Sequence, residues 1–173
     1  MSDKNEKTNR RDFLFTASYT IGAVGVGAVI WPLIHQMNPD KAQQALATTE
    51  VDISQVEPGN SITVLWRGKP VFLKRRTPEE ILEARAVSLL DLPDPQKDEE
   101  RVKEGKDEWL VMLGVCTHLG CVPLKDKGDY KGWFCPCHGS HYDGSGRIRK
   151  GPAPKNMEIP KFEFVDNNTI KIG

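Results

Sequence analysis

The chain of 173 residues lacks an excess of either charge. Lysine and arginine together number 24, aspartate and glutamate also number 24, and the formal net charge is +0. A chain without a strongly basic surface is not expected to bind nucleic acid. Internal repeats and low-complexity tracts are not apparent, and no nucleophile with a general base suggests a catalytic activity of the chain on its own. Cysteine and histidine are scarce as well, with four residues of each.

Charged side chains are absent from residues 13–34. At about 1.5 Å per residue, a helix over this run is long enough to cross a hydrocarbon layer of about 30 Å. A buried core helix is the alternative, but this run is terminal and too long for a small domain. We therefore predict a transmembrane anchor over residues 13–35, with Trp31 at one membrane interface.

The residues around the apolar run indicate its orientation. Several basic residues precede the run and only Lys41 follows shortly after it, which predicts a cytoplasmic N-terminus and an exported C-terminal part. Arg10 and Arg11 directly before the run are typical of a twin-arginine (Tat) export signal. The string 45–47, Ala-Leu-Ala, resembles a cleavage site, but cleaved signals have apolar cores of only about 7 to 15 residues. We predict an uncleaved signal anchor.

Two short strings hold every cysteine of the chain and two of its histidines. They are Cys116-Thr-His118-Leu-Gly-Cys121 and Cys135-Pro-Cys137-His138-Gly-Ser140. Cys-x-His followed by Cys-x-x-His is the ligand pattern of a Rieske [2Fe–2S] centre, in which two thiolates hold one iron and two imidazoles hold the other. Imidazoles make such a centre less negative and easier to reduce, and their second ring nitrogen can carry a proton.

Two cysteines are left over once four ligands are counted. A disulfide between the two strings is their natural use, and it persists only in an oxidising compartment. Spacing alone leaves open which cysteines bind metal and which pair. A structural zinc site is the alternative cofactor, but four cysteines and two histidines exceed what one zinc needs. A second zinc would need more ligands than His35 and His141 add, so an iron–sulfur centre is favoured.

The chain resembles the Rieske iron–sulfur subunits of bacterial cytochrome bc1 complexes, which are ubiquinol–cytochrome c reductases. The resemblance extends over residues 116–123, 135–144 and 151–154. It implies one [2Fe–2S] cluster, a set of ligands, and a disulfide between the remaining cysteines. The implied ligands are Cys116, His118, Cys135 and His138, and the implied disulfide joins Cys121 and Cys137.

The same resemblance assigns roles to residues around these ligands. Ser140 and Tyr142 are implied as hydroxyl donors to the cluster sulfurs, which stabilise the reduced state and raise the potential. The segment 151–154, Gly-Pro-Ala-Pro, is implied to form a rigid loop that shields the cluster. His138 or His118 is implied as the catalytic contact of the quinol, and His138 is our choice because it lies in the second string.

The exported part is expected to be an all-β antiparallel sandwich with an inserted, loop-rich cluster subdomain at about 116–154. Runs rich in β-branched and aromatic residues, separated by glycine, proline and asparagine, predict its strands. The predicted strands are 62–66, 69–74, 109–115, 132–134, 162–165 and 169–172. The segment from Val165 to Thr169 predicts the turn of a closing hairpin.

A charged segment interrupts this pattern between Thr77 and Lys106. Thr77-Pro-Glu-Glu80 predicts a helix that begins with a capping box. We interpret the charges of the segment as a solvated face. The segment resembles the insertion of bc1-type heads in Asp94-Pro-Gln and in Asp98-Glu-Glu-Arg-Val, which favours that family over the shorter Rieske ferredoxins.

These observations predict a division of the chain and a function. The predicted parts are a cytoplasmic N-terminus at 1–12, the anchor at 13–35, a flexible linker at 36–50 and a periplasmic Rieske domain at 51–173, all at the bacterial inner (plasma) membrane. The resemblance implies electron transfer from quinol to cytochrome c1, with cytochrome b as a further partner, in a dimeric respiratory complex. Activity would belong only to the assembled translocase. The alternatives are a Rieske subunit of another quinol chain or of a periplasmic oxidase, and a zinc domain.

Overall fold

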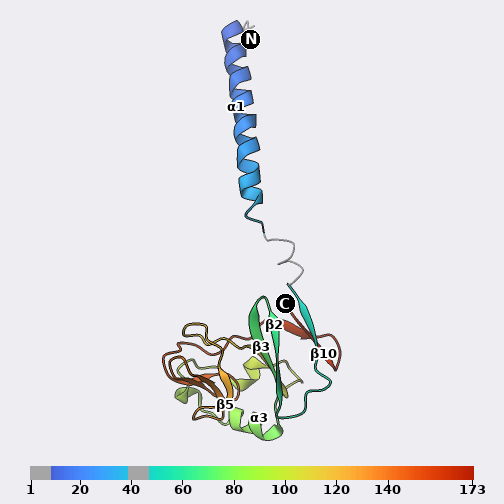
Figure 1. Ribbon diagram of the computed structural model, residues 1–173, viewed down its shortest axis with the longest axis vertical. Helices are drawn as coiled ribbons and strands as arrows, with labels where there is room; N and C mark the ends of the chain where they lie inside the picture. Colours follow the sequence, from blue (N-terminus) through green and yellow to red (C-terminus); the bar gives the residue numbers. More distant parts are fainter. Residues whose placement is uncertain (1–8, 39–46) are drawn as a thin grey trace, which may run out of the picture. The chain divides into compact units, whose positions relative to one another are not determined.

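The chain divides into two compact units, Met1–Gln44 and Ala45–Gly173. The computed structural model in Figure 1 describes residues 9–38 and 47–173, and each unit is considered by itself. The first residues of the predicted N-terminal part, the first two residues of the string 45–47 and most of the predicted linker lie outside the described residues.

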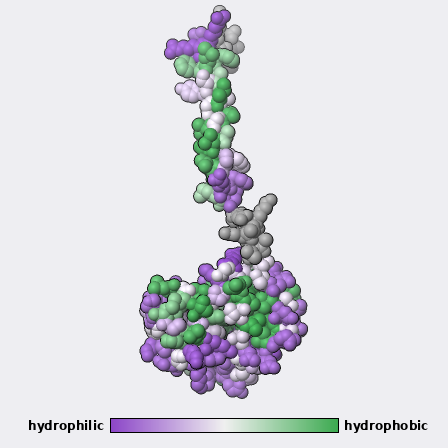
Figure 2. Space-filling model, in the orientation of Figure 1, coloured by the Kyte–Doolittle hydropathy of each residue, from purple (hydrophilic) through white to green (hydrophobic). Residues whose placement is uncertain are grey.

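The described part of the first unit is the helix α1 (Arg10–His35). The twin arginines open the helix, three residues before the predicted start of the anchor. None of its residues is buried, although most are apolar, and Figure 2 shows apolar side chains between polar residues at its two ends. The hydroxyls of Thr16 and Thr20 each donate to a carbonyl one turn earlier at 2.8 Å, so the helix satisfies these polar groups itself. Its length and composition suffice to cross a membrane.

The second unit, which we call the head (residues 47–173), contains three antiparallel sheets in its described part (Figure 1). Their orders are β1-β10-β9, β2-β3-β4 and β5-β6-β7-β8. The strands are β1 (Thr49–Asp52), β2 (Ser61–Trp66), β3 (Lys69–Arg75), β4 (Trp109–Leu113), β5 (Leu124–Lys127), β6 (Gly132–Cys135), β7 (Ser140–Tyr142), β8 (Ile148–Lys150), β9 (Phe162–Phe164) and β10 (Thr169–Ile172). The predicted antiparallel all-β head is confirmed, and so is the closing hairpin, in which β9 pairs with β10.

Strand β4 explains how one head holds two cores. All five residues of the strand are buried, which accounts for its uninterrupted apolar sequence. Because side chains alternate along a strand, Val111 and Leu113 pack in a first core with residues of the sheet β1-β10-β9. Leu110 and Met112 point the other way and pack in a second core, which contains Cys116 and Cys135 of the two cysteine strings. We call the sheets β1-β10-β9 and β2-β3-β4 the base of the head. Strand β4 therefore packs both within this base and against the cysteine strings.

The second core is built around aromatic stacking. Phe72 on β3 stacks on Trp133 on β6, with ring centroids 4.4 Å apart and planes 7° from parallel. Phe72 also lies against the backbone of Gly114, where a Cβ would fall 2.5 Å from the ring, so the chain can pass closely only with glycine there. This contact sets the path of the chain from β4 into the first cysteine string.

The segment between β3 and β4 contains the helix α3 (Pro78–Arg85) and two short 3₁₀ helices, η1 (Leu89–Asp91) and η2 (Asp98–Arg101). The predicted capping box is confirmed, since Thr77 Oγ1 accepts from the Glu80 amide and the Glu80 carboxylate accepts from the Thr77 amide. The interpretation of all the charges as a solvated face is wrong. Asp98 and Arg101 are 1 % and 2 % exposed, because they bind groups of the cluster subdomain.

Asp98 lies at the centre of this buried polar contact. Its Oδ1 accepts from Arg76 Nη1 at 2.6 Å, and the hydroxyl of Ser145 donates to the same oxygen. Arg101 donates from Nε to the Ser145 carbonyl and from Nη2 to the Met157 carbonyl, both at 2.7 Å. The charged segment therefore attaches the cluster subdomain to the base of the head. The buried Asp98 carboxylate is compensated by Arg76, 22 residues away, and Arg101 by carbonyls 44 and 56 residues away in the sequence.

Candidate iron–sulfur site

Two loops of similar local geometry carry the cysteine strings. The first follows β4 and the second joins β6 to β7. In each, the carbonyl of the first cysteine accepts a hydrogen bond from a glycine amide four residues later, Cys116 from Gly120 at 2.9 Å and Cys135 from Gly139 at 3.0 Å. Both glycines have positive φ, 84° and 73°, which side chains disfavour. The repeated glycine thus closes each loop back on its cysteine.

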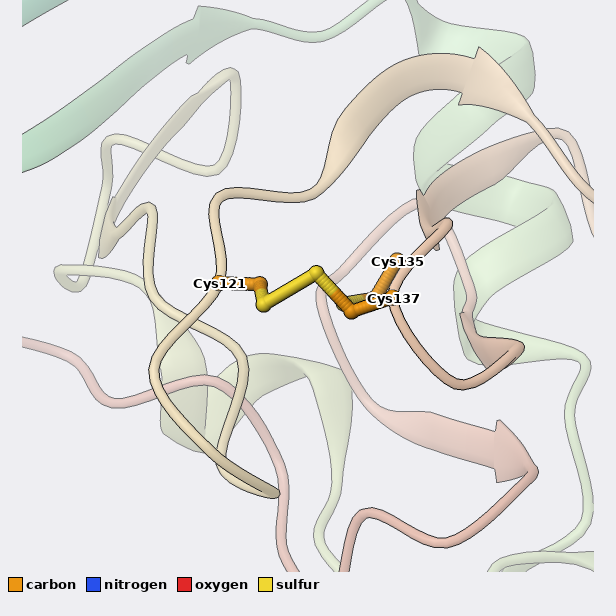
Figure 3. Close-up of side chains that lie close together, drawn as sticks. All are labelled: Cys121, Cys135 and Cys137. Carbon is orange, nitrogen blue, oxygen red and sulfur yellow. A yellow bond between two sulfur atoms is a disulfide. The ribbon is translucent and has the colours of Figure 1, made fainter.

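The four cysteines divide into one disulfide and one pair of free thiols. Cys121 and Cys137 are bonded, so the pairing implied by the family resemblance is confirmed. Figure 3 shows this bond between the two loops, with Cys135 beside Cys137, and the sulfurs of these three residues lie within 4.8 Å of one another. Cys116 and Cys135 are free and each is 2 % exposed. The two thiols available to bind metal are therefore the buried ones.

The histidines of the two strings face each other. The ring centroids of His118 and His138 lie 4.7 Å apart, with planes at 87°. His118 Nδ1 is buried and has no hydrogen-bond partner among residues 9–38 and 47–173, which is costly for a ring nitrogen unless something else binds it. His138 is exposed. Each loop therefore carries one buried free thiol and one imidazole, and of the two imidazoles that of His138 reaches solvent.

Hydroxyl groups surround the Cys116 sulfur. Burial acts to raise the pKa of this thiol, but hydrogen bonds from Tyr142, from the His118 amide and from Ser140 outweigh it, and the pKa lies below its ordinary value. The Tyr142 hydroxyl donates to Cys116 Sγ at 3.2 Å. Burial raises the pKa of Cys135. Burial, followed by the hydrogen bond to Cys116, raises the pKa of Tyr142 to about 12, which keeps this phenol a donor.

Three further hydrogen bonds at the site were not predicted from the sequence. Thr117 donates from Oγ1 to the Lys155 carbonyl at 2.6 Å, and its amide donates to the Tyr142 hydroxyl at 3.2 Å. The amide of Ala153 donates to Ser140 Oγ at 3.2 Å. A threonine and a main-chain amide carry no sequence signal for such roles, because all three hydrogen bonds join segments that are distant in the sequence.

The remaining histidines lie elsewhere. His141 Nδ1 accepts from the Asp129 amide at 3.1 Å, and its ring packs edge-on against Phe134 at 4.8 Å between centroids. His35 is the last residue of α1, in the other unit. Of the four histidines, His118 and His138 therefore lie in the two cysteine loops close to each other, and His141 serves as part of a hairpin.

Comparison with known families agrees with this geometry. The family described as the Rieske [2Fe-2S] domain matches residues 49–163, which include both cysteine loops. The chain belongs to the Rieske [2Fe-2S] family. The Rieske domain is preceded by a match of residues 1–40 to the TAT signal of the ubiquinol–cytochrome c reductase Fe-S subunit, so the predicted Tat signal is confirmed.

Known relatives align with almost the whole chain. The chain is 57% identical over 173 residues to the ubiquinol-cytochrome c reductase iron-sulfur subunit of Blastochloris viridis, covering 99% of this chain and 96% of that one. It is 52% identical to the subunit of the same name from Rickettsia felis, covering 99% and 97%. Among solved structures it is similar to a chain of a hyperthermophilic respiratory Complex III, with TM-score 0.53, 29% identity and coverage of 90% and 97%.

Proposed function

We propose that this Rieske protein is the electron-transfer subunit of a bacterial quinol–cytochrome c oxidoreductase. In this proposal Cys116 and Cys135 bind one iron of the [2Fe–2S] cluster, and His118 and His138 bind the other. The observation that carries the assignment is that each cysteine loop supplies one buried free thiol and one imidazole, with the two thiols next to each other and the two imidazole centroids 4.7 Å apart. It is supported by relatives named ubiquinol-cytochrome c reductase iron-sulfur subunit.

The donor atoms fit such a cluster. His118 Nδ1 is buried without a partner among the described residues, as expected of a nitrogen reserved for a metal. Cys121 and Cys137 are already oxidised to a disulfide, so neither can supply a thiolate, although both lie close to Cys135. A closed tetrahedral zinc site of the same four ligands is the alternative, and the match to the Rieske [2Fe-2S] domain favours the iron–sulfur cluster.

Each residue of the site would have a separate role in electron transfer. When bound, a Rieske cluster supplies one-electron redox chemistry at a potential above that of an all-cysteine cluster. Tyr142 and Ser140 hold hydroxyl hydrogens near the sulfur of Cys116 and favour additional negative charge there. The ring of His138 is exposed, and with one nitrogen on the metal its second nitrogen would be available to accept the proton that a quinol must lose. The disulfide holds the two loops together.

The partners and the location follow from the same proposal. A quinol bound to cytochrome b would deliver the electron, cytochrome c1 would receive it, and the subunit would work in a dimeric complex. The helix α1 would anchor the chain once in the bacterial inner membrane, with the basic N-terminus in the cytoplasm and the head in the periplasm. An exported head agrees with the disulfide. The proposed linker at 36–50 would let the head travel between the partners.

Metal analysis of the purified complex tests the proposal, with matched histidine variants. We expect iron, acid-labile sulfide and a reduced-cluster EPR signal in the wild type, together with quinol-dependent reduction of cytochrome c. His138→Gln should abolish the EPR signal, whereas His141→Gln, which alters a histidine outside the proposed ligand set, should retain it.

Two results would contradict the proposal. Stoichiometric zinc in a colourless protein would favour the zinc domain. Co-purification with molybdopterin in place of b and c1 haems would favour a periplasmic oxidase.

A further inference from the structure

Asn156 is buried at the point where the charged segment between β3 and β4 meets the cluster subdomain. It is 7 % exposed, and all its polar side-chain groups are bonded. Its Oδ1 accepts from the Ile148 amide at 2.9 Å, and its Nδ2 donates to the Asp94 carbonyl at 3.0 Å and to Gln96 Oε1 at 3.3 Å. Its own amide donates to Asp94 Oδ2 at 2.9 Å. Asp94 therefore accepts hydrogen bonds from both the backbone amide and the side-chain amide of Asn156.

This contact fixes the end of the proline loop, which we define as residues 151–155. The loop is attached to both cysteine loops, because the Lys155 carbonyl accepts from Thr117 and the Ala153 amide donates to Ser140 Oγ. At its start, a Cβ on Gly151 would lie 2.5 Å from the Gly139 carbonyl oxygen, so the two backbones are in direct contact. A displacement of the proline loop would therefore also move Ser140.

The Ala153 amide occupies one acceptor site of the Ser140 hydroxyl. The Ser140 side chain is 1 % exposed and is among the groups that lower the pKa of the Cys116 thiol, which places its hydroxyl near that sulfur. Because its oxygen accepts from Ala153, its single hydrogen remains available to donate to sulfur. A donor aimed at sulfur stabilises the more negative, reduced state of an iron–sulfur centre.

We propose that Asp94 and Asn156 are positioning residues that hold the proline loop in place and thereby aim the Ser140 hydroxyl at the cluster sulfurs. The proposal rests on the proposed function, since it concerns the reduction potential of the cluster. Neither residue touches a proposed ligand. Each acts through the Ala153 amide and Ser140, so weakening the contact lowers the potential and loosens residues 151–155 together.

The charge of Asp94 provides a way to separate positioning from electrostatics. Removing a nearby carboxylate makes the surroundings of the cluster less negative, which by itself raises the potential. Asp94→Ala and Asp94→Asn both remove the charge, but asparagine keeps an oxygen that can accept from the Asn156 amide. If Asp94 acts by positioning the loop, the reduction potential should fall in Asp94→Ala and not in Asp94→Asn. If Asp94 acts only through its charge, the potential should rise equally in both variants.

The experiment compares these two variants with Asn156→Ala and with a distant control, Asn167→Ala. Asn167 is exposed, and within the part of the chain that the structure describes its side chain accepts a hydrogen bond only from Lys106. Redox titration of the purified complex gives the potential, and hydrogen exchange followed by mass spectrometry gives the protection of peptides over 151–157. We expect a lower potential and roughly tenfold or faster exchange in Asp94→Ala and Asn156→Ala. Asp94→Asn and Asn167→Ala should keep wild-type exchange and show no decrease in potential.

An equal rise of potential in Asp94→Ala and Asp94→Asn, with exchange unchanged, would overturn the proposal. If Asn156→Ala fails to fold, the two Asp94 variants still decide. A wild type without iron would reject the proposed function, while the exchange comparison in that protein would still report whether Asp94 holds the proline loop.

Discussion

Tyr142→Phe tests the proposed site most directly. The Tyr142 side chain is 0% exposed, and its hydroxyl donates to Cys116 Sγ and accepts from the Thr117 amide, both at 3.2 Å. Phenylalanine keeps the ring that packs in the second core and removes only the oxygen. The variant therefore separates the hydrogen bond to sulfur from the packing of the core.

The magnitude follows from the strength of a hydrogen bond to a charged acceptor. Such a bond contributes about 1.5 to 3 kcal/mol, but it is present in both oxidation states. If about half of it depends on the additional electron, the reduced state loses about 1 kcal/mol. Since a tenfold change for one electron corresponds to about 59 mV, the potential should fall by about 40 mV. The Thr117 amide loses its acceptor as well, which should lower the stability of the head by about 1 kcal/mol.

Redox titration of the complex, monitored by the EPR of the reduced cluster, measures this change. Because the pKa of Tyr142 is raised to about 12, the donor stays protonated, and the difference from wild type should be constant between about pH 6 and pH 10. Tyr130→Phe is a matched control, since Tyr130 packs against Arg149 and His141, outside the proposed ligand set. An unchanged or higher potential in Tyr142→Phe would refute the role assigned to this hydroxyl.

Two further predictions concern stability. Asp98→Ala leaves the buried guanidinium of Arg76 without its carboxylate and should reduce the free energy of unfolding by about 3 kcal/mol, as measured by urea denaturation; Glu99→Ala, at an exposed neighbour, should change it by less than about 0.5 kcal/mol, and equal effects would contradict the burial argument. Replacing both Cys121 and Cys137 by alanine opens a disulfide across 16 residues and should cost about 3 kcal/mol, seen as loss of the cluster EPR signal at a lower temperature. Retention of the signal to the wild-type temperature would exclude a stabilising role of the bond.

Local patterns in the sequence predicted the parts of the fold that carry a strong local signal. The capping box at Thr77, the apolar run of β4 and the hairpin after Val165 are each specified by neighbouring residues. Four strands were missed, β1, β5, β7 and β8. They are short, and β5 is mostly exposed Leu-Lys-Asp-Lys. Such segments become strands because a partner supplies hydrogen bonds, as β6 does for β5 and β7.

The charged segment between β3 and β4 shows why burial is harder to predict than chemistry. Asp98 is followed by charged neighbours, and nothing in that string distinguishes it from a solvated face. It is buried because Arg76 and Ser145, far away in the sequence, meet it in the folded head. A buried ion pair needs both partners to arrive together, so a local pattern cannot specify it.

The sequence alone determined which chemical groups this protein possesses and which of its segments is long and apolar enough to cross a membrane. These features are two strings of cysteine and histidine and an apolar run that follows two arginines. Each is a property of neighbouring residues, so it can be recognised without knowledge of the fold. Only the tertiary structure decided how those groups are divided. Spacing left the cysteine pairing open, and the approach of the two loops joins Cys121 to Cys137 while burying the other two thiols. The contacts of Tyr142 with Cys116 and of Asn156 with Asp94 likewise depend on packing between distant segments, because hydrogen bonds form wherever the core places their partners.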